Sequence, residues 1–317
     1  MKYIVTTTIN EPTIATKKFC KIADEKDWMF VVVGDTKTPH ESYYKLKEEY
    51  KNFVYLHPGD QEAMYPKLSE TIGWRSIQRR NIGFVEAYKE SNNKVIATID
   101  DDNIPYDDWG SDIKVNTKVN INHYRGNTYV FDPISPTSYH DKIWHRGFPL
   151  DYVPERKKAI LLQDKEVEVK VQADFWNGDP DIDAMARLTV KPYCDFNSEK
   201  GLFPFTSENI HPFNSQNTFL SRDVIPHYAV WPHVGRMDDI WGGYYLQTKI
   251  KPNQVIFDKA SVYQNRNEQD LITNLEKEII GYRNTLSWVL NCCTLNSDLI
   301  PDETKKFLDI YFNEFSK

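Results

Sequence analysis

Residues 94–103 read KVIATIDDDN and decide the fold. The first six residues are mostly apolar and β-branched, which predicts a buried strand. The strand runs directly into three carboxylates, Asp100, Asp101 and Asp102. Ligands of open parallel sheets bind beyond the carboxyl ends of the strands. The three aspartates therefore stand where such a sheet would place an active site.

Strands and helices alternate on the amino-terminal side of this stretch. Strands are predicted at 3–9, 28–33 and 53–56, and helices at 13–23, 42–51 and 73–89. The alternation favours βαβ units and a mainly parallel sheet flanked by helices, which is the α/β class. Asn10 and Asp35 follow the first two strands, so both are expected beside the three aspartates at one edge of the sheet.

The pattern is less regular from 111 to 265, where short β-like runs, aromatic residues and prolines predict substantial loops. Helical spacing returns at 268–290 and 302–315. No internal repeat, low-complexity tract or flexible linker divides the chain. We therefore predict one catalytic domain, 1–265, followed by a C-terminal helical extension, 266–317.

The composition argues against several classes of protein. The net charge is −7 with interspersed signs, so no basic domain marks a nucleic-acid binder. No stretch approaches the ~20 apolar residues that span a bilayer, and the first ten residues lack a signal peptide's features. The four cysteines show no metal-ligand spacing and suit a reducing compartment. We expect a cytoplasmic protein, either monomeric or a homo-oligomer.

The three aspartates indicate a metal site. Adjacent carboxylates raise each other's pKa unless a cation compensates their charge. Mg²⁺ and Mn²⁺ favour oxygen ligands, and a diphosphate would complete the coordination shell. The alternative is an exposed acidic turn. The position after a buried strand favours the metal, held by Asp100 and Asp102.

A basic segment precedes the aspartates by one predicted helix. It reads WRSIQRRNIGF over 74–84, and helical spacing places Arg75 and Arg79 on one face. A planar guanidinium binds two phosphate oxygens at once, so these arginines are candidates for a diphosphate. The alternative is a solvated basic helix surface.

A second acidic pair, Asp238-Asp239, is a candidate general base for a reacting hydroxyl. Either carboxylate also suits the cap of a helix starting near Ile240. Trp241, followed by two glycines, suits a sugar-stacking floor or a buried core position equally well. The aromatic content of 14 % fits a stacking cleft or a tyrosine-rich core.

Several blocks resemble glycosyltransferase sequences. The segment RRNIGFVEAYKESNNKVIATIDDDN resembles the Arg-Asn-x-Gly helix, strand and Asp-x-Asp block of GT-A glycosyltransferases. VVVGDTKTP, WRSIQRRNIGF, IDDDN and VYQNRNEQD are similar to the STELLO-type family. HRGFPL, FWNGDPDIDA and GRMDDIWGGYY are similar to plant reversibly glycosylated proteins, which are UDP-arabinopyranose mutases. Together the blocks cover residues from about 3 to 280.

The resemblance implies a GT-A, Rossmann-like fold and a nucleotide-sugar donor, with UDP as its nucleotide. It implies Mn²⁺ or Mg²⁺ at Asp100 and Asp102, with Gln264 at the late metal-side position, and a carbohydrate or glycoconjugate acceptor. Arg146 matches the arginine tied to reversible glycosylation. The expected contacts to the nucleotide sugar are Thr8, Asn10, Asp35, Arg75, Arg79, Asn81, Asp100, Asp101, Trp176, Asp181 and Trp241. For Asp181, the competing interpretation is a turn stabilised by its own side chains.

Three functions compete. The first is sugar transfer to a hydroxyl, with Asp238 or Asp239 as base. The second is a sugar-nucleotide mutase that interconverts ring forms of the sugar through Arg146 or a neighbouring carboxylate. Two departures from the mutase motifs, Val153 for its second arginine and Gln264 for its histidine, favour the transferase. The third is a catalytically idle scaffold, against which the retained aspartates argue.

Overall fold

The computed structural model describes residues 2–90, 92–266 and 269–316. The described strands form one sheet: β1 (Tyr3–Thr8), β2 (Met29–Gly34), β3 (Phe53–Leu56), β4 (Val95–Ile99), β5 (Asn103–Pro105), β6 (Lys118–Arg125), β7 (Ile160–Leu161), β8 (Lys165–Glu168), β9 (Val171–Gly178), β10 (Phe205–Ser207), β11 (Asn217–Ser221) and β12 (Val255–Gln264).

The α-helices are α1 (Ile14–Lys26), α2 (His40–Glu49), α3 (Pro58–Met64), α4 (Pro66–Ile72), α5 (Arg80–Lys89), α6 (Ala184–Thr189), α7 (Asp238–Leu246), α8 (Leu271–Leu290) and α9 (Asp302–Glu314). Short 3₁₀ helices include Ile77–Arg79, Leu150–Glu155, Phe196–Ser198, Arg222–His227, Gly235–Met237 and Pro252–Gln254. Helices α3 and α4 were not among the sequence predictions, because each is only seven residues long and lacks a clear apolar stripe.

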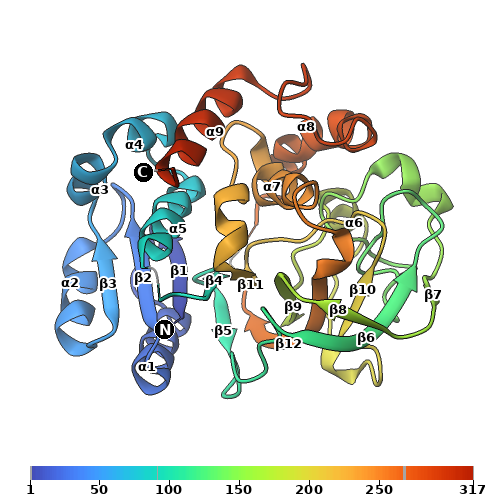
Figure 1. Ribbon diagram of the computed structural model, residues 1–317, viewed down its shortest axis with the longest axis horizontal. Helices are drawn as coiled ribbons and strands as arrows, with labels where there is room; N and C mark the ends of the chain where they lie inside the picture. Colours follow the sequence, from blue (N-terminus) through green and yellow to red (C-terminus); the bar gives the residue numbers. More distant parts are fainter. Residues whose placement is uncertain (1, 91, 267–268, 317) are drawn as a thin grey trace.

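The sheet has two halves. Its order is β3-β2-β1-β4-β11-β9-β12-β10-β6-β7, with β5 on β12 and β8 on β6 (Figure 1). Strands β3, β2, β1 and β4 are all parallel, whereas β11 runs antiparallel to both of its neighbours. The half beyond β11 is mixed, with β12 parallel to β9 and antiparallel to β10. The predicted α/β class, with helices flanking the sheet, is confirmed.

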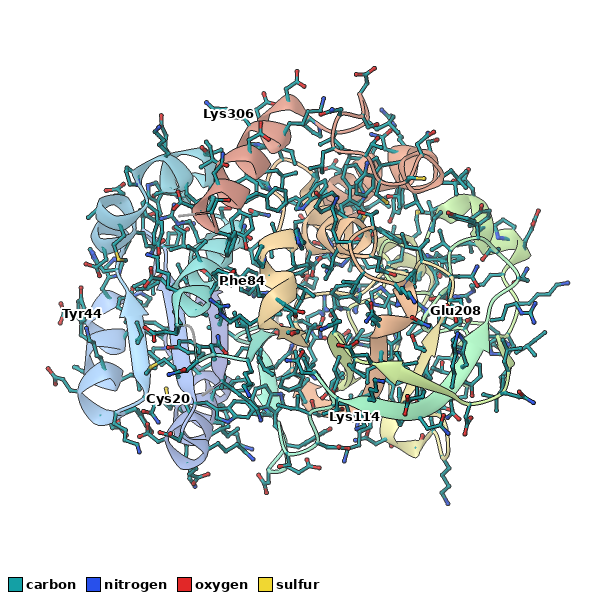
Figure 2. All side chains as sticks on the ribbon, in the orientation of Figure 1. Cys20, Tyr44, Phe84, Lys114, Glu208 and Lys306 are labelled. Atoms are coloured by element: carbon teal, nitrogen blue, oxygen red, sulfur yellow. The ribbon has the colours of Figure 1, made fainter. Side chains whose placement is uncertain are left out.

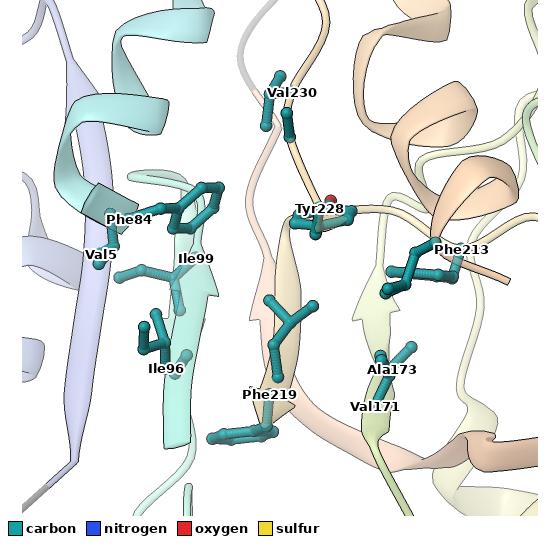
Figure 3. Packing of buried hydrophobic residues seen from close by; sticks show 14 of the residues in the cluster. Val5, Phe84, Ile96, Ile99, Val171, Ala173, Phe213, Phe219, Tyr228 and Val230 are labelled. Carbon is teal, nitrogen blue, oxygen red and sulfur yellow. The ribbon is translucent and has the colours of Figure 1, made fainter. Parts of the chain in front are cut away.

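Helix α5 lies close to the parallel half of the sheet. Side chains fill the space between sheet and helices (Figure 2). At Gly83 the helix backbone lies close to side chains of β1 and β2. A Cβ atom at Gly83 would stand 2.5 Å from a methyl group of Val5. Phe84 is fully buried and points toward Ile99 at the end of β4 (Figure 3). This packing brings the first residue of α5, Arg80, to the edge where the aspartates begin.

The predicted helix 73–89 is wrong over its first residues. Arg75 has a φ of 60°, Ser76 is extended, and α5 starts only at Arg80. The Asp35 carboxylate accounts for the difference, because its Oδ2 accepts from the backbone N–H of Arg75 (2.7 Å) and of Ser76 (3.2 Å). These two N–H groups are therefore not available to a helical turn.

The C-terminal helices cover the edge of the sheet that carries the aspartates. Helix α8 packs on the 3₁₀ helix Gly235–Met237 and on α6, while α9 packs on α4 (Figure 1). Gly235 has a φ of 59°, and a Cβ there would collide with the carbonyl of Lys277 on α8. The predicted helices 268–290 and 302–315 correspond to α8 and α9, although residue 268 lies outside the described residues. None of the described helices is long and apolar enough to cross a bilayer.

Candidate functional site

Asp100 follows β4 directly and meets an arginine from α5. Arg80 Nη2 donates to Asp100 Oδ1 at 2.5 Å, and Arg80 Nη1 donates to the Ser215 hydroxyl at 2.8 Å. The Arg80 side chain is 1 % exposed. The guanidinium is therefore a fixed internal charge that holds one oxygen of Asp100.

Asp102 carries a buried oxygen without a partner. Its Oδ1 forms no hydrogen bond with any described residue. Burial and the neighbouring charge of Asp100 raise the pKa of Asp102 to about 7. A divalent cation between the two carboxylates would relieve both penalties, and Gln264 lines the same cavity as a third oxygen donor. The residues present therefore fit the predicted metal.

The protein does not complete such a site with its own side chains. Among the described residues, no group of three or more histidine, cysteine, aspartate or glutamate side chains is placed to hold a metal ion. The predicted set has only two carboxylates and one amide. A diphosphate would supply the missing oxygen ligands. The donor set thus suits a cation that binds together with an anionic ligand.

A cavity of about 260 Å³ joins both acidic motifs. We call it the reaction cavity, and its lining is Ile77, Asp100, Asp102, Arg146, Asp181, Ser215, Arg236, Asp238, Asp239, Gln264, Arg266 and Gln269. Its carboxylates come from the end of β4, from the loop after β9 and from the start of α7. The topology therefore brings residues more than 130 positions apart to one edge of the sheet.

Arg146 is the centre of the charge network in this cavity. Its Nε and Nη2 donate to Asp181 Oδ2 at 3.1 and 2.9 Å, and its Nη1 lies 3.1 Å from Asp239 Oδ1. Its Nη1 also donates to the carbonyl of Arg236. Burial opposes the charge, but the surrounding carboxylates raise the pKa of Arg146 well above its ordinary value. Arg146 is thus a permanent, fully engaged cation.

The two adjacent aspartates at the start of α7 have pKa values that are shifted in opposite directions. Asp239 Oδ2 accepts from the Ser215 N–H (2.7 Å) and hydroxyl (3.0 Å); although burial opposes it, the charge of Arg146 lowers the pKa of Asp239. Asp238 accepts from Gln78 Nε2 at 3.0 Å and from the Asp239 N–H at 2.9 Å. Burial and the charge of Asp239 raise the pKa of Asp238 to about 7. Asp238 is therefore poised to exchange a proton near neutral pH.

A second cavity, of about 320 Å³, adjoins the other side of the aspartate motif. We call it the nucleoside pocket, after the ligand that we propose for it below. Its lining is Thr7, Thr8, Ile9, Asn10, Lys37, Arg75, Ser76, Ile77 and Asp101. Asp101 Oδ2 accepts from the Thr8 hydroxyl and from Asn10 Nδ2 (2.9 Å). Ile9 and Ile77 are 48 % and 44 % exposed, which suits contact with a flat apolar ring. Predicted residues Thr8, Asn10, Arg75 and Asp101 therefore meet in one place.

Three predicted nucleotide contacts serve the fold instead. Asp35 is 1 % exposed and holds the backbone of residues 75–76, so it shapes the nucleoside pocket without lining it. Arg79 is fully buried, donates to Gln61 Oε1 at 2.9 and 2.6 Å, and does not line either cavity. Asn81 is fully buried and bonds to the backbone of Val230 in both directions.

The predicted aromatic contacts are core residues. Trp241 is fully buried, donates to the Thr285 hydroxyl at 2.9 Å and packs on Trp231 and Trp288. Trp176 is 2 % exposed and lies outside both cavities. The core interpretation of Trp241 is therefore correct. The presence of a tryptophan in the sequence did not distinguish a sugar-stacking surface from a position in the hydrophobic core.

Asp181 lines the reaction cavity but is occupied by arginines. It accepts hydrogen bonds from Arg146 and Arg236, and Arg266 Nη2 forms an ion pair with it at 3.1 Å. The charges of these arginines lower the pKa of Asp181 well below the usual range, although burial opposes this. A carboxylate with three cationic partners orients those cations rather than a sugar hydroxyl.

Sequence reasoning did not select several residues of the site. Arg79 rather than Arg80 was selected from the sequence. Gly83 and Phe84 lie on the same helical face as Arg80, and this is the face that packs on the sheet. Arg236 and Arg266 lie inside blocks that were noted for other residues. Glu278 of α8 is fully buried and accepts from Arg236 Nε at 2.8 Å. Only the tertiary packing of α8 reveals its role.

Comparison with known proteins finds likeness to solved structures. No protein-family profile matches the chain, and no curated protein matches its sequence. Glucosyl-3-phosphoglycerate synthase from Mycobacterium tuberculosis in complex with phosphoglyceric acid is 11 % identical with a TM-score of 0.46, over 92 % of this chain and 80 % of that chain. The same enzyme in complex with Mg²⁺ and UDP is 11 % identical with a TM-score of 0.43, over 92 % and 79 %. With TM-scores below 0.5, the functional assignment rests on the residues of the site.

Proposed function

We propose that the chain is a metal-dependent glycosyltransferase of the GT-A type, which moves a sugar from a nucleoside diphosphate to a hydroxyl acceptor. One observation carries the proposal. A single cavity holds Asp100 and Asp102, with a buried unpartnered oxygen, and also holds Asp238. The first pair suits a metal-bound diphosphate and the last suits a general base, which are the two groups that this transfer needs.

The nucleotide would span both cavities. The base and ribose would occupy the nucleoside pocket, and the diphosphate would pass Asp101 toward Asp100 and Asp102 in the reaction cavity. Ile77 lines both cavities, so they adjoin. Mg²⁺ or Mn²⁺, when bound there, would neutralise charge on the leaving diphosphate.

Asp238 is the proposed base. The acceptor oxygen forms a bond to the anomeric carbon of the sugar, while the bond from that carbon to the diphosphate breaks and its electron pair leaves with the nucleoside diphosphate. Asp238 takes the acceptor proton. Asp239 is held by Ser215 and Arg146 and keeps the neighbouring charge fixed. This arrangement supports direct displacement with inversion.

A mutase that works through Arg146 requires a nucleophilic guanidinium, and the environment of Arg146 opposes that role. Arg146 is 6 % exposed, and its guanidinium contacts Asp181, Asp239 and the Arg236 carbonyl. Its raised pKa keeps it protonated, so no nitrogen lone pair is free to attack a sugar. We therefore assign Arg146 to holding the carboxylates in place.

Incubation of the purified protein with a panel of UDP-sugars and Mn²⁺ or Mg²⁺ tests the proposal. Release of free UDP that requires the metal and increases with a hydroxyl acceptor is the expected result. A changed sugar nucleotide without free UDP, or label retained on the protein but lost in Arg146→Ala, would establish the mutase instead. Absence of both products across the panel would leave a binding or scaffold protein.

A further inference from the structure

A third cavity opens beside the reaction cavity. It measures about 540 Å³ and is lined by Asp179, Arg187, Leu188, Thr189, Val190, Lys191, Arg266, Gln269 and Leu271. Arg266 and Gln269 line both cavities, so the two spaces share a wall. Nothing in the donor-binding arrangement above uses the segment 187–191. The side cavity is therefore free to receive the second substrate.

The charge of this side cavity is opposite to that of the reaction cavity. Among its described lining residues, three carry positive charge (Arg187, Lys191 and Arg266) and one carries negative charge (Asp179). Arg187 pairs with Asp179 at 2.6 Å. Lys191 is exposed and forms no ion pair with any described residue. Arg266 pairs with Asp181, a carboxylate that it shares with Arg146 and Arg236, so among the described lining cations Lys191 is the one left without an ion pair.

Arg266 points to the ligand independently of this count. Its side chain is only 6 % exposed, its Nη2 lies 3.1 Å from Asp181, and its Nε is buried without a hydrogen-bond partner. A buried unpartnered donor on a cation is costly unless an acceptor reaches it. Because Arg266 lines the wall between the two cavities, an anion seated in the side cavity would lie next to a cation whose hydrogen-bonding capacity is incompletely used.

We propose that the side cavity binds the acceptor through an anionic group, a phosphate or a carboxylate, so that the acceptor hydroxyl extends into the reaction cavity. The inference rests on the proposed function and narrows its acceptor class. A neutral oligosaccharide site typically offers aromatic faces, whereas the described lining here contains no aromatic residue. Leu188, Val190 and Leu271 supply apolar contact for a short carbon chain. A small, charged hydroxyl compound fits this combination better than a neutral glycan.

Matched ligands test the anion requirement. Glycerol, glycerate and glycerol 3-phosphate offer similar hydroxyl groups with no anion, a carboxylate and a phosphate, and each is titrated by calorimetry. We expect glycerol 3-phosphate to bind and glycerol not to bind. Binding of glycerate as tight as that of the phosphate would assign the class to carboxylates, and weaker binding would assign it to phosphates. Equal binding of glycerol and glycerol 3-phosphate, or binding of neither, would overturn the proposal.

Matched variants locate the site. Lys191→Gln should raise the Kd for glycerol 3-phosphate by about fivefold, as expected for one partly exposed charged contact. Lys306→Gln, at an exposed position on α9 at the upper edge of Figure 2, removes the same charge elsewhere and should leave that Kd unchanged. Equal effects of the two variants would contradict the assignment. Titration of UDP with Mg²⁺ into Lys191→Gln reports on the donor site separately, so loss of anion binding alone and loss of UDP binding alone are distinguishable.

Discussion

Two buried acidic groups occupy the same sheet and differ in what surrounds them. At the end of β4, Asp102 has a pKa raised to about 7 and an unpartnered buried oxygen beside a cavity of about 260 Å³. Within β9, burial and the charge of Asp258 raise the pKa of Asp174 to about 8. Asp174 pairs across the strands with Asp258, and the cavity beside them measures only about 20 Å³.

The hydrogen bonds explain the difference. Asp174 accepts from Gln172 Nε2 at 2.8 Å and from the Ser261 hydroxyl at 2.6 Å. Asp258 accepts from Lys114 Nζ at 2.6 Å and from the Lys259 N–H at 2.8 Å. Asp102 and Asp174 therefore both have raised pKa values. Only Asp102 also has an unpartnered oxygen and a neighbouring cavity large enough for a ligand. Burial of carboxylates alone does not identify a site.

The largest expected difference between the carboxylates of the reaction cavity, which include Asp102 and Asp238, and the Asp174–Asp258 pair is catalytic. Asp238→Asn should lower kcat by about 10²–10⁴-fold with donor binding retained, because the variant removes the general base but keeps a similar shape. Asp174→Asn should leave kcat within a factor of about two, because Asp174 does not line the reaction cavity. Steady-state kinetics of both variants makes the comparison. Equal losses would mean that the two acidic groups act together.

Arg75 and Arg79 allow a similar comparison. Arg79 is expected to contribute to the stability of the fold, and Arg75 is expected to contribute to UDP binding. Arg79→Ala should lower the free energy of unfolding by about 3 kcal/mol, because it removes buried charged hydrogen bonds to Gln61 and Ser69. Its Kd for UDP should not change. Arg75→Ala should show the opposite pattern, with weaker UDP binding and a free energy of unfolding within about 0.5 kcal/mol of the wild type. Urea unfolding and calorimetry together check the pair, and exchanged phenotypes would contradict the assignment.

Substitution of Asp174 should change the free energy of unfolding of the protein rather than its catalytic activity. Its folded pKa of about 8 exceeds that of an unfolded aspartate, about 3.9, so the unfolded state binds fewer protons between these values. Wild-type stability therefore falls as pH rises through this window. Asp174→Asn cannot ionise at this position and should gain on the order of 4 kcal/mol relative to the wild type between pH 5 and pH 8. A constant difference across that range, measured by urea unfolding, would refute the raised pKa.

Asp238 should determine the pH dependence of turnover. Burial and the charge of Asp239 raise its pKa to about 7, and only the ionised form accepts a proton. The rate should therefore fall about tenfold per pH unit below pH 7 and level off above it. Asp174→Asn should follow the same profile. A wild-type rate that stays flat down to pH 5.5, with the fold intact, would exclude Asp238 as the base.

Much of the parallel half of the fold was predictable because its signals are local. The apolar runs of β2 and β4 and the polar residues after them are read directly from the sequence, and they place Asp100 and Asp101 correctly. The helix expected from residue 73 failed because a distant carboxylate, Asp35, captures the backbone of Arg75 and Ser76. Helical spacing contains no information on such a long-range bond.

The site was predictable only in its acidic part. The local pattern of aspartates after a buried strand sufficed to place Asp100 and Asp102 beside one cavity, while their role as metal ligands stays a prediction. Arginines and tryptophans serve cores and sites equally: Arg79 and Trp241 are buried for the fold, whereas Arg80 and Arg266 face the carboxylates of the reaction cavity. The role of each arginine and tryptophan depends on which face of a helix packs on the sheet. It also depends on how β12 and α8 bring late parts of the chain to the edge of the sheet.

Calorimetric titration of UDP with and without Mg²⁺ or Mn²⁺ tests the metal-diphosphate site most directly. The wild type and Asp174→Asn should bind UDP far more tightly with the metal than without it, because residues 2–90, 92–266 and 269–316 contain no group of three or more ligating side chains that would complete the coordination shell. Asp100→Asn combined with Asp102→Asn should lose this metal dependence while keeping the wild-type unfolding transition. UDP binding that is undiminished and still metal-dependent in that double variant would contradict the account.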